Sequence, residues 1–294
     1  MRILVLGAGG QLGRDLVPGL VAAGHEVVGL ARADLDITDP DGVASAVEGR
    51  SPEVVVNLAA YTKVDLAERE AELAFAINRD GAGLVARACA AAGVPLCHLS
   101  TDFVFTQAPE HIPRPWRVAD RPYPRGVYAT SKREGELACL EAGGDLFIVR
   151  TSWLYGNRGP NFPLAILRAA TRSNQLRVVQ DQIGCPTWTA DLSRALAWLV
   201  ATDNFGIHHL SGAGCCSWYQ FARAILDGLG VPAELIPVST SEWGAAAPRP
   251  SYSVLDNSEY ISLGGPPLAD WQDELRDYLA SERDGAVAAA LSGG

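Results

Sequence analysis

Residues 2–13 read RILVLGAGGQLG, an apolar run that ends in a glycine-rich turn. The run has the length and composition of a buried parallel strand, and apolar residues recur at helical spacing just after the turn. A second apolar run at 25–30 completes a strand–turn–helix–strand unit. Glycines in such a turn let a pyrophosphate approach the backbone N–H groups at the start of the helix. The spacing of Gly7, Gly10 and Gly13 therefore predicts a dinucleotide site.

The same alternation of strands and helices continues to about residue 156. Further strands are predicted at 54–58, 95–99 and 146–150, and helices at 40–48, at 81–92 and around 127–132. Such alternation is typical of an α/β fold with a Rossmann-type, doubly wound parallel sheet. Later elements are predicted as helices at 162–171 and 191–201, a short strand at 176–179, a strand at 207–210 that rejoins the sheet, and two helices within 218–279.

This change of rhythm after Gly156 predicts two domains, the second a smaller α/β substrate-binding domain. The expected boundaries are a dinucleotide-binding domain at 1–156 with a return segment at about 188–212, a substrate-binding domain at 157–187 and 213–282, and a tail at 283–294.

The bulk composition argues against several classes of partner. The chain has 294 residues, a net charge of −10 and a pI near 5.0, which disfavour nucleic acid or an anionic membrane surface. We recognise no signal peptide, and no apolar run reaches the ~20 residues that span a bilayer. The six cysteines form no Cys-x-x-Cys pair, which indicates reduced thiols and no zinc site. We therefore expect a cytoplasmic protein.

Tyr128 and Lys132 are four residues apart, which places them one turn apart on one face of a helix. A phenol has a pKa near ~10, and a neighbouring ammonium is expected to lower that pKa toward working pH. Such a tyrosine exchanges a proton with a substrate oxygen. Taken alone, the pair also fits an ordinary exposed amphipathic helix. Thr101 follows the strand at 95–99, at the edge where open α/β sheets bind ligands, although it also suits a strand-end cap.

The choice of cofactor depends on Arg32, which lies just past the second strand, where the adenosine ribose of a dinucleotide would be placed. A basic residue suits a 2′-phosphate, so NADPH is predicted, with NADH as the alternative. A solvated loop arginine is the other interpretation. Small residues after the strand at 54–58, Ala59 and Ala60, would let a cofactor approach the backbone.

Taken in order, the motifs resemble the dTDP-4-dehydrorhamnose reductase family, within the extended short-chain dehydrogenase/reductase superfamily. The resemblance covers roughly residues 1–280. The motifs that carry it are Gly7-x-x-Gly10-Gln11-Leu12-Gly13, Asn57-Leu58-Ala59-Ala60-Tyr61-Thr62-x-Val64-Asp65-x-Ala67-Glu68, Ser100-Thr101-Asp102-Phe103-Val104-Phe105, Tyr128-x-x-Ser131-Lys132-x-x-Gly135-Glu136, Arg150-Thr151-Ser152-Trp153-Leu154-Tyr155-Gly156, Asn161-Phe162, Asp181-Gln182-x-Gly184-x-Pro186-Thr187 and Arg249-Pro250-x-x-Ser253-x-Leu255-Asp256.

The resemblance implies an NAD(P)H-dependent oxidoreductase of rhamnose biosynthesis. A hydride would pass to C4 of a dTDP-4-keto-6-deoxysugar, most directly dTDP-4-dehydro-L-rhamnose. Tyr128 would protonate the developing alkoxide, Lys132 would lower the pKa of Tyr128 and bind the nicotinamide ribose, and Thr101 would orient the same oxygen. The implied cofactor-binding residues are Gly7, Gly10, Gln11, Leu12, Gly13, Arg32, Asp36, Ile37, Ala59, Ala60, Tyr61, Tyr128 and Lys132.

The substrate-binding positions implied by the resemblance are Thr101, Asp102, Tyr128, Trp153, Asn161 and Arg249. Arg249 and Asn161 would bind the diphosphate of the nucleotide, but Arg249 also suits an inter-domain ion pair. Trp153 would line the substrate pocket, or alternatively belong to the core. The segment 106–125 would be a lid, in which Val118 replaces the usual glutamate of the family.

Some family members hold Mg²⁺ at a dimer interface through acidic residues. Only Asp15 and Asp191 are candidates here, and Ala190 occupies an expected acidic position, so the prediction is no metal site. A homodimer is the oligomeric state that the resemblance suggests. Two rival functions stay open: a reductase for a different nucleotide-linked keto sugar in secondary metabolism, of the dihydrostreptose type, which Val118 favours, and a non-catalytic NADP-binding regulatory subunit.

Overall fold

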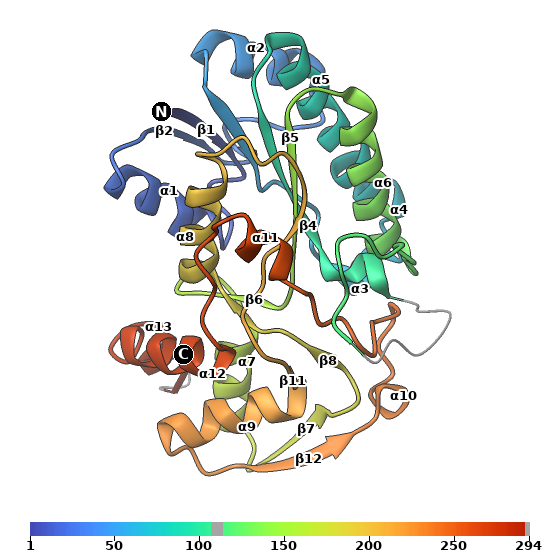
Figure 1. Cartoon of the computed structure of the whole chain (residues 1–294). Coiled ribbons are helices and arrows are strands. Elements are labelled where there is room, and N and C mark those ends of the chain that lie inside the picture. The colour runs from blue at the N-terminus through green and yellow to red at the C-terminus, as the bar shows by residue number, and fades with distance from the viewer. Residues whose placement is uncertain (107–113, 292–294) are drawn as a thin grey trace.

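The computed structural model describes residues 1–106 and 114–291. A six-stranded sheet forms the upper part of the molecule in Figure 1, with all neighbouring strands parallel and the order β10-β5-β4-β3-β1-β2. Its strands are β1 (Arg2–Leu6), β2 (Glu26–Leu30), β3 (Val54–Asn57), β4 (Leu96–Thr101), β5 (Leu146–Thr151) and β10 (Gly206–His209). Strand β1 has β2 on one side and β3 on the other, so the strand order reverses at β1. The predicted doubly wound sheet is confirmed.

Helices cover both faces of this sheet because its central strands are apolar on both sides. In β1 the side chains alternate, so that Ile3 and Val5 join one core cluster and Leu4 and Leu6 the other. One face carries α1 (Gly13–Ala22), α8 (Thr189–Leu199) and the short α11 (Ser258–Ser262). The opposite face carries α2 (Pro40–Arg50), α5 (Ala82–Ala92) and α6 (Val127–Ala142).

Short helical segments follow the carboxyl ends of β3 and β4. They are α3 (Val64–Ala67), α4 (Ala71–Phe75), the π-helix η1 (Ala76–Gly81) and the 3₁₀-helix η2 (Asp102–Phe105). The π-turn presents Asn78, whose side-chain amide donates to Ser131 Oγ at 3.0 Å and to the carbonyl of Tyr61 at 3.1 Å. Asn78 therefore ties the chain after β3 to helix α6.

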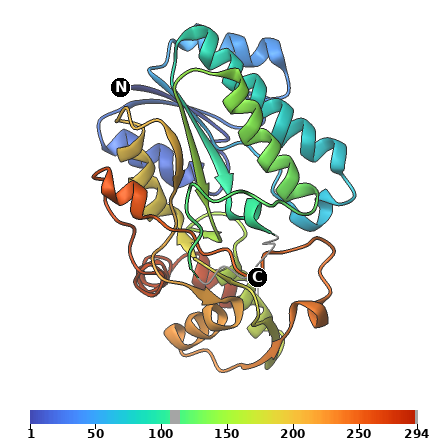
Figure 2. The same cartoon turned by 45° about the vertical axis from the view of Figure 1, so that its right-hand side comes forward.

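A second group of helices and strands lies below the large sheet (Figure 2), and its buried side chains form a separate core. Its helices are α7 (Phe162–Ala170), α9 (Trp218–Leu229), α10 (Thr240–Trp243), α12 (Trp271–Ser281) and α13 (Ala286–Leu291). Its strands are β6 (Leu154–Tyr155), β7 (Gln175–Val179), β8 (Ile183–Gly184), β9 (Thr187–Trp188), β11 (Cys216–Ser217) and β12 (Glu234–Val238), joined in the pairs β6–β9, β7–β12 and β8–β11. Helix α13 lies in the predicted tail, and its Val287 and Ala290 are buried in this core.

The predicted bounds of the six strands of the large sheet agree with the structure within two residues, whereas the helix expected around 127–132 extends to Ala142. The prediction of two helices within 218–279 was wrong, because this range holds α9, α10, α11, α12 and strand β12. Helices α10 and α11 have four and five residues, too few to show a helical period in the sequence. Strand β12 contains Pro237, which normally indicates an edge strand or a loop. Within the described ranges, no helix is long and apolar enough to cross a membrane.

Candidate active site

The glycine turn after β1 brings the backbone of β1 against the chain that follows β3. Gly7 has a φ of +78°, and a Cβ built on it would lie 2.6 Å from the backbone nitrogen of Ala59. A Cβ on Gly13 would lie 2.6 Å from Cα of Ala8. Side chains at Gly7 and Gly13 are therefore excluded by backbone contacts. Gln11 adds a buried side-chain amide nitrogen that has no hydrogen-bond partner in the described part of the chain.

Two cavities meet at this turn. The first, of about 440 Å³, contains Gly7, Gly10, Arg32, Asp36, Ile37, Ala59 and Ala60 among its lining residues. The second, of about 470 Å³, contains Gly7, Gly10, Gln11, Leu12, Gly13, Thr101, Asp102, Tyr128, Lys132 and Trp153. The turn thus lies between an outer cavity beside β2 and an inner cavity that reaches α6. Tyr61 lines neither cavity, because it is buried with its hydroxyl on Glu70 at 2.7 Å.

The outer cavity has two arginines on its wall, Arg32 and Arg14. Nε of Arg14 donates to the carbonyl of Gly9 at 2.8 Å, which orients its guanidinium beside the glycine turn. The acidic residue of this wall, Asp36, accepts hydrogen bonds from the backbone and side chain of Thr38, and these bonds hold the pKa of Asp36 below its usual value. The wall of the outer cavity therefore carries two cationic side chains, Arg32 and Arg14, and one carboxylate, Asp36, that accepts hydrogen bonds from Thr38.

Tyr128 and Lys132 enter the inner cavity from the first turns of α6. Lys132 is 2% exposed, and its Nζ donates to the carbonyl of Leu99 at 2.7 Å. Burial lowers the pKa of Lys132 to about 8 and raises the pKa of Tyr128 to about 12, while the Thr101 hydroxyl acts to lower the latter. The expectation that Lys132 lowers the pKa of Tyr128 therefore differs from the structure. Removal of the phenol from water has the larger effect on its pKa, and the Lys132 ammonium donates to a carbonyl of β4.

Thr101 and Asp102 form the opposite wall at the end of β4. The Thr101 hydroxyl donates to Oδ1 of Asp102 at 3.2 Å and accepts from the backbone N–H of Phe103, so it also acts as the predicted cap. Asp102 is 1% exposed, and burial raises the pKa of its carboxyl to about 7, although the nearby hydroxyls of Ser253 and Thr101 oppose this rise. The ring of Phe103 meets that of Tyr128 edge-on, with centroids 5.3 Å apart.

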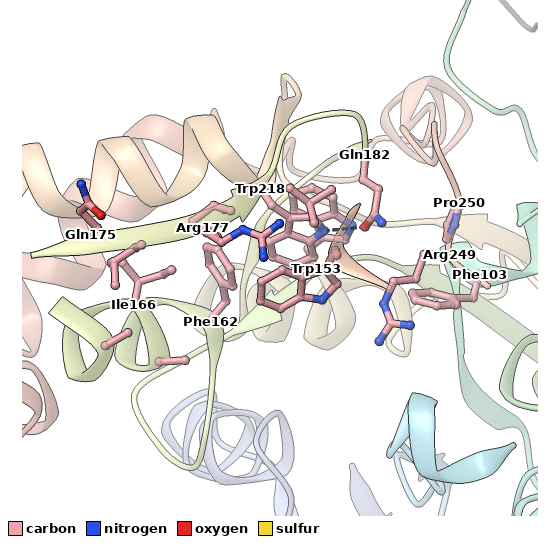
Figure 3. A pocket seen from close by; sticks show the side chains of 16 residues that line it. Phe103, Trp153, Phe162, Ile166, Gln175, Arg177, Gln182, Trp218, Arg249 and Pro250 are labelled. Atoms are coloured by element: carbon pink, nitrogen blue, oxygen red, sulfur yellow. Dashed lines mark hydrogen bonds between the residues drawn. The ribbon is translucent and has the colours of Figure 1, made fainter. Parts of the chain in front are cut away.

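A third cavity, of about 530 Å³, opens in the lower part of the molecule beside the inner one. Trp153 and Trp218 stack with their ring centroids 3.5 Å apart, and both line the third and inner cavities together with Phe103 (Figure 3). Trp218 Nε1 donates to Oε1 of Gln182 at 3.2 Å. Trp153 thus lies between the two cavities as the predicted pocket residue, with only intermediate burial.

The third cavity has two arginines on opposite sides of the stacked indoles, Arg177 and Arg249 (Figure 3). Arg249 donates to both carboxylate oxygens of Asp65, at 2.9 and 2.7 Å, which is the ion-pair alternative predicted for it. Arg177 forms no ion pair within residues 1–106 and 114–291. Asn161 instead caps α7 through Leu164 N and does not line any of the three cavities.

The predicted lid is only partly described, since residues 107–113 lie outside the described residues. Its later portion is anchored at Trp116, which is 1% exposed, stacks on Phe105 and donates from Nε1 to the carbonyl of Tyr252. Val118 follows two residues after this anchor and is partly exposed.

The two acidic metal candidates are engaged in other contacts. Asp15 accepts a hydrogen bond from the Thr189 hydroxyl, and Asp191 contacts Arg194 and the backbone N–H of Ala269. Among the described residues, no group of three or more His, Cys, Asp or Glu side chains is placed to hold a metal ion.

The sequence did not indicate several residues that line these cavities. Trp218 lies far along the chain from the quoted motifs, and Arg177 lies just before the motif that begins at Asp181 but outside it, so nothing local marks either as a cavity residue. Arg14 directly follows the last glycine of the turn, and its position beside the phosphate-binding motif was the available signal.

Comparisons with known proteins agree with this arrangement. A family model described as RmlD substrate binding domain matches residues 1–283. The chain is 44% identical over 283 residues to a dTDP-4-dehydrorhamnose reductase of Streptomyces griseus, covering 94% of this chain and 92% of that protein. It is 41% identical over 285 residues to the spore coat polysaccharide biosynthesis protein SpsK of Bacillus subtilis strain 168, covering 97% and 99%. The crystal structure of dTDP-4-dehydrorhamnose reductase from Bacillus anthracis strain Ames in complex with NADP superimposes with a TM-score of 0.91, at 37% identity, covering 95% of this chain and 99% of that one.

Proposed function

This chain belongs to the RmlD substrate binding domain family, and on that premise we propose that it reduces the C4 keto group of dTDP-4-dehydro-L-rhamnose to give dTDP-L-rhamnose, with NADPH as the reductant. The observation that carries the proposal is the position of Thr101, Tyr128 and Lys132 in the inner cavity. That cavity joins the glycine turn on one side and the aromatic cavity on the other. A dinucleotide and a nucleotide sugar can therefore approach the same three side chains from opposite directions.

The residues around the glycine turn fit a dinucleotide. Backbone contacts exclude a Cβ at Gly7 and Gly13, and Gln11 has a buried amide nitrogen that lacks a hydrogen-bond partner in the described chain. These features suit a pyrophosphate on the N-terminus of α1. The chemistry supplied by a bound reduced nicotinamide is the hydride. We assign the 2′-phosphate of NADPH to Arg32, with Arg14 beside it on the same wall.

Tyr128 is proposed to donate the proton that the alkoxide at C4 requires. A pKa of about 12 keeps the phenol protonated at neutral pH, which is the form a general acid needs. Thr101 lines the same cavity and would donate its hydroxyl proton to the same oxygen, turning away from Asp102 to do so. The Lys132 ammonium would then stabilise the phenolate left on Tyr128 once the proton has moved.

The nucleotide part of the substrate is proposed to occupy the aromatic cavity. Its indole rings from Trp153 and Trp218 offer flat apolar surfaces for a base, and Arg177 offers a guanidinium without an ion-pair partner in the described residues. Arg249 already donates two N–H groups to Asp65 and one to the carbonyl of Ala247, so it has fewer donors left for a diphosphate. We therefore give Arg177 the larger share of diphosphate binding.

The test is turnover of NADPH by the purified chain with enzymatically prepared dTDP-4-dehydro-L-rhamnose. We expect loss of NADPH absorbance together with formation of dTDP-L-rhamnose. Turnover only with a different dTDP-linked keto sugar, such as a dihydrostreptose precursor, would replace the substrate and keep the reaction. Tight NADPH binding with no reduction of any keto sugar would refute the proposal and support the regulatory alternative.

A further inference from the structure

A buried cluster of charges lies directly behind the inner cavity, on the side of α6 that faces the sheet. Glu136 is one helical turn after Lys132, and it is 0% exposed. Its Oε1 accepts from Ser100 Oγ at 2.5 Å and from Arg150 Nε at 2.8 Å. Its Oε2 accepts from Arg150 Nη2 at 2.8 Å and from Arg133 Nη1 at 2.6 Å. Both oxygens of the Glu136 carboxylate thus accept two hydrogen bonds each, and the donors come from β4, β5 and α6 itself.

This cluster joins the elements that carry the proposed proton donors. Ser100 immediately precedes Thr101, and it lies in register with Arg150 on the neighbouring strand. Lys132 donates to the carbonyl of Leu99, one residue earlier on β4. Helix α6 is therefore attached to two consecutive residues of β4, just before Thr101. A shift of α6 along the sheet would break both attachments and separate Tyr128 from Thr101.

The cluster also controls charge beside Lys132. Arg150, Ser100 and Arg133 hold the pKa of the buried Glu136 carboxyl to about 2 although burial acts to raise it, so the carboxylate is ionised throughout the working range. Its charge acts against the burial that lowers the pKa of Lys132. Other titratable groups that face the pair are His98 on β4, Cys139 on α6 and, across Arg150, His209 on β10.

We propose that Glu136 is a positioning residue for the reduction: it fixes the end of β4 against α6, so that Thr101 and Tyr128 face one substrate oxygen, and it supplies the negative charge that keeps Lys132 protonated. The role in catalysis rests on the proposed function, whereas the effect on the charge of Lys132 does not. Buried ion pairs add little net stability compared with apolar side chains of similar volume. We therefore assign the Glu136–Arg150 pair a role in the geometry and charge of the inner cavity rather than in stability.

The lysine content of the chain allows a direct measurement. It contains two lysines, Lys63 and Lys132, and Lys63 is exposed. Protein labelled with carbon-13 lysine should therefore give two Cε signals, which Lys63→Arg assigns. The Lys132 signal is expected to titrate near its lowered pKa of about 8. Neither signal depends on substrate, cofactor or turnover.

Glu136→Gln keeps the shape of the side chain and removes its charge. We expect the Lys132 titration to move down by about one pH unit or more, and the alkaline limb of kcat to move with it. Arg133→Gln, which removes a cation from the same carboxylate near the surface, should move the titration upward. Glu141→Gln, on the exposed part of α6, is the matched control and should leave both signals unchanged.

An unchanged Lys132 titration in folded Glu136→Gln overturns the charge role. If that variant does not fold, Arg133→Gln decides in its place, and no upward movement overturns it. Ser100→Ala tests the geometric role separately: kcat should fall about tenfold while the Lys132 titration stays in place, and an unchanged kcat overturns it. If the wild-type enzyme does not turn over the substrate but the Lys132 titration still moves down in Glu136→Gln, the proposed function is refuted and the charge role stays supported.

Discussion

Replacement of Tyr128 by phenylalanine removes one hydroxyl and leaves the rest of the side chain in place. The ring meets Phe103 edge-on at 5.3 Å, and a phenyl ring retains that contact. Loss of one side-chain hydroxyl costs about 1 kcal/mol of folding free energy. A general acid contributes about 10²–10⁴-fold to a rate, equivalent to about 3–5 kcal/mol of activation free energy. The variant should therefore remain folded and lose nearly all its activity.

The assay compares the rate of NADPH oxidation by wild type and Tyr128→Phe with dTDP-4-dehydro-L-rhamnose, at matched cofactor occupancy. Binding of NADPH, followed by its fluorescence, should change little, because the glycine turn and Arg32 are untouched. Tyr219→Phe is the matched control: it removes a phenol hydroxyl on α9, where the nearest partner is Arg223. A Tyr128→Phe enzyme that keeps more than about a tenth of the wild-type kcat would refute the assignment of Tyr128 as proton donor.

Three further predictions concern the cofactor, the pH dependence and the ion pair at the aromatic cavity. Arg32→Ala should weaken NADPH about tenfold more than NADH, because only NADPH carries the phosphate that Arg32 would bind; equal losses by calorimetry would remove this role. Because burial lowers the pKa of Lys132 to about 8, kcat should fall as pH rises through that value, and a flat profile would contradict the need for an ammonium. Asp65 is half exposed, so its coupling to Arg249 in a double-mutant cycle of urea unfolding should be about 1 kcal/mol or less, and a coupling well above that would show a buried pair.

Local patterns predicted much of the fold. The strands of the large sheet have a strong apolar pattern, and their predicted bounds agree with the structure within two residues. Among the covering helices, α6 was expected only around 127–132 and extends to Ala142. The elements that were missed include α10, α11 and β12, which are short or contain proline, and α13, which lies in the predicted tail. They acquire their structure from the neighbours that they pack against, such as the pairing of β12 with β7, which no local pattern encodes.

The candidate site divides in the same way. Glycines at fixed spacing and the Tyr128–Lys132 pair are short-range features, so their position on a turn and a helix could be predicted. Trp218 and Arg177 could not be assigned to the cavity, because they reach it only after the chain has folded back on α7 and the strands of the lower core. Whether Arg249 is free or paired depended on Asp65, 184 residues earlier in the chain.

By itself the sequence determined the parallel α/β architecture, the glycine turn at the end of β1 and the helical spacing of Tyr128 and Lys132. All three depend on residues close together in the chain, whose sterics and periodicity act locally. Only the tertiary structure decided the protonation states of the site residues and the side chains that they contact. The pKa values of Tyr128 and Lys132 follow from removal from water, and the charge of Glu136 follows from Ser100 and Arg150 on two strands of the sheet. Desolvation and ion pairing depend on atoms that folding brings together from distant parts of the chain, so the size of both effects is set only in the folded protein.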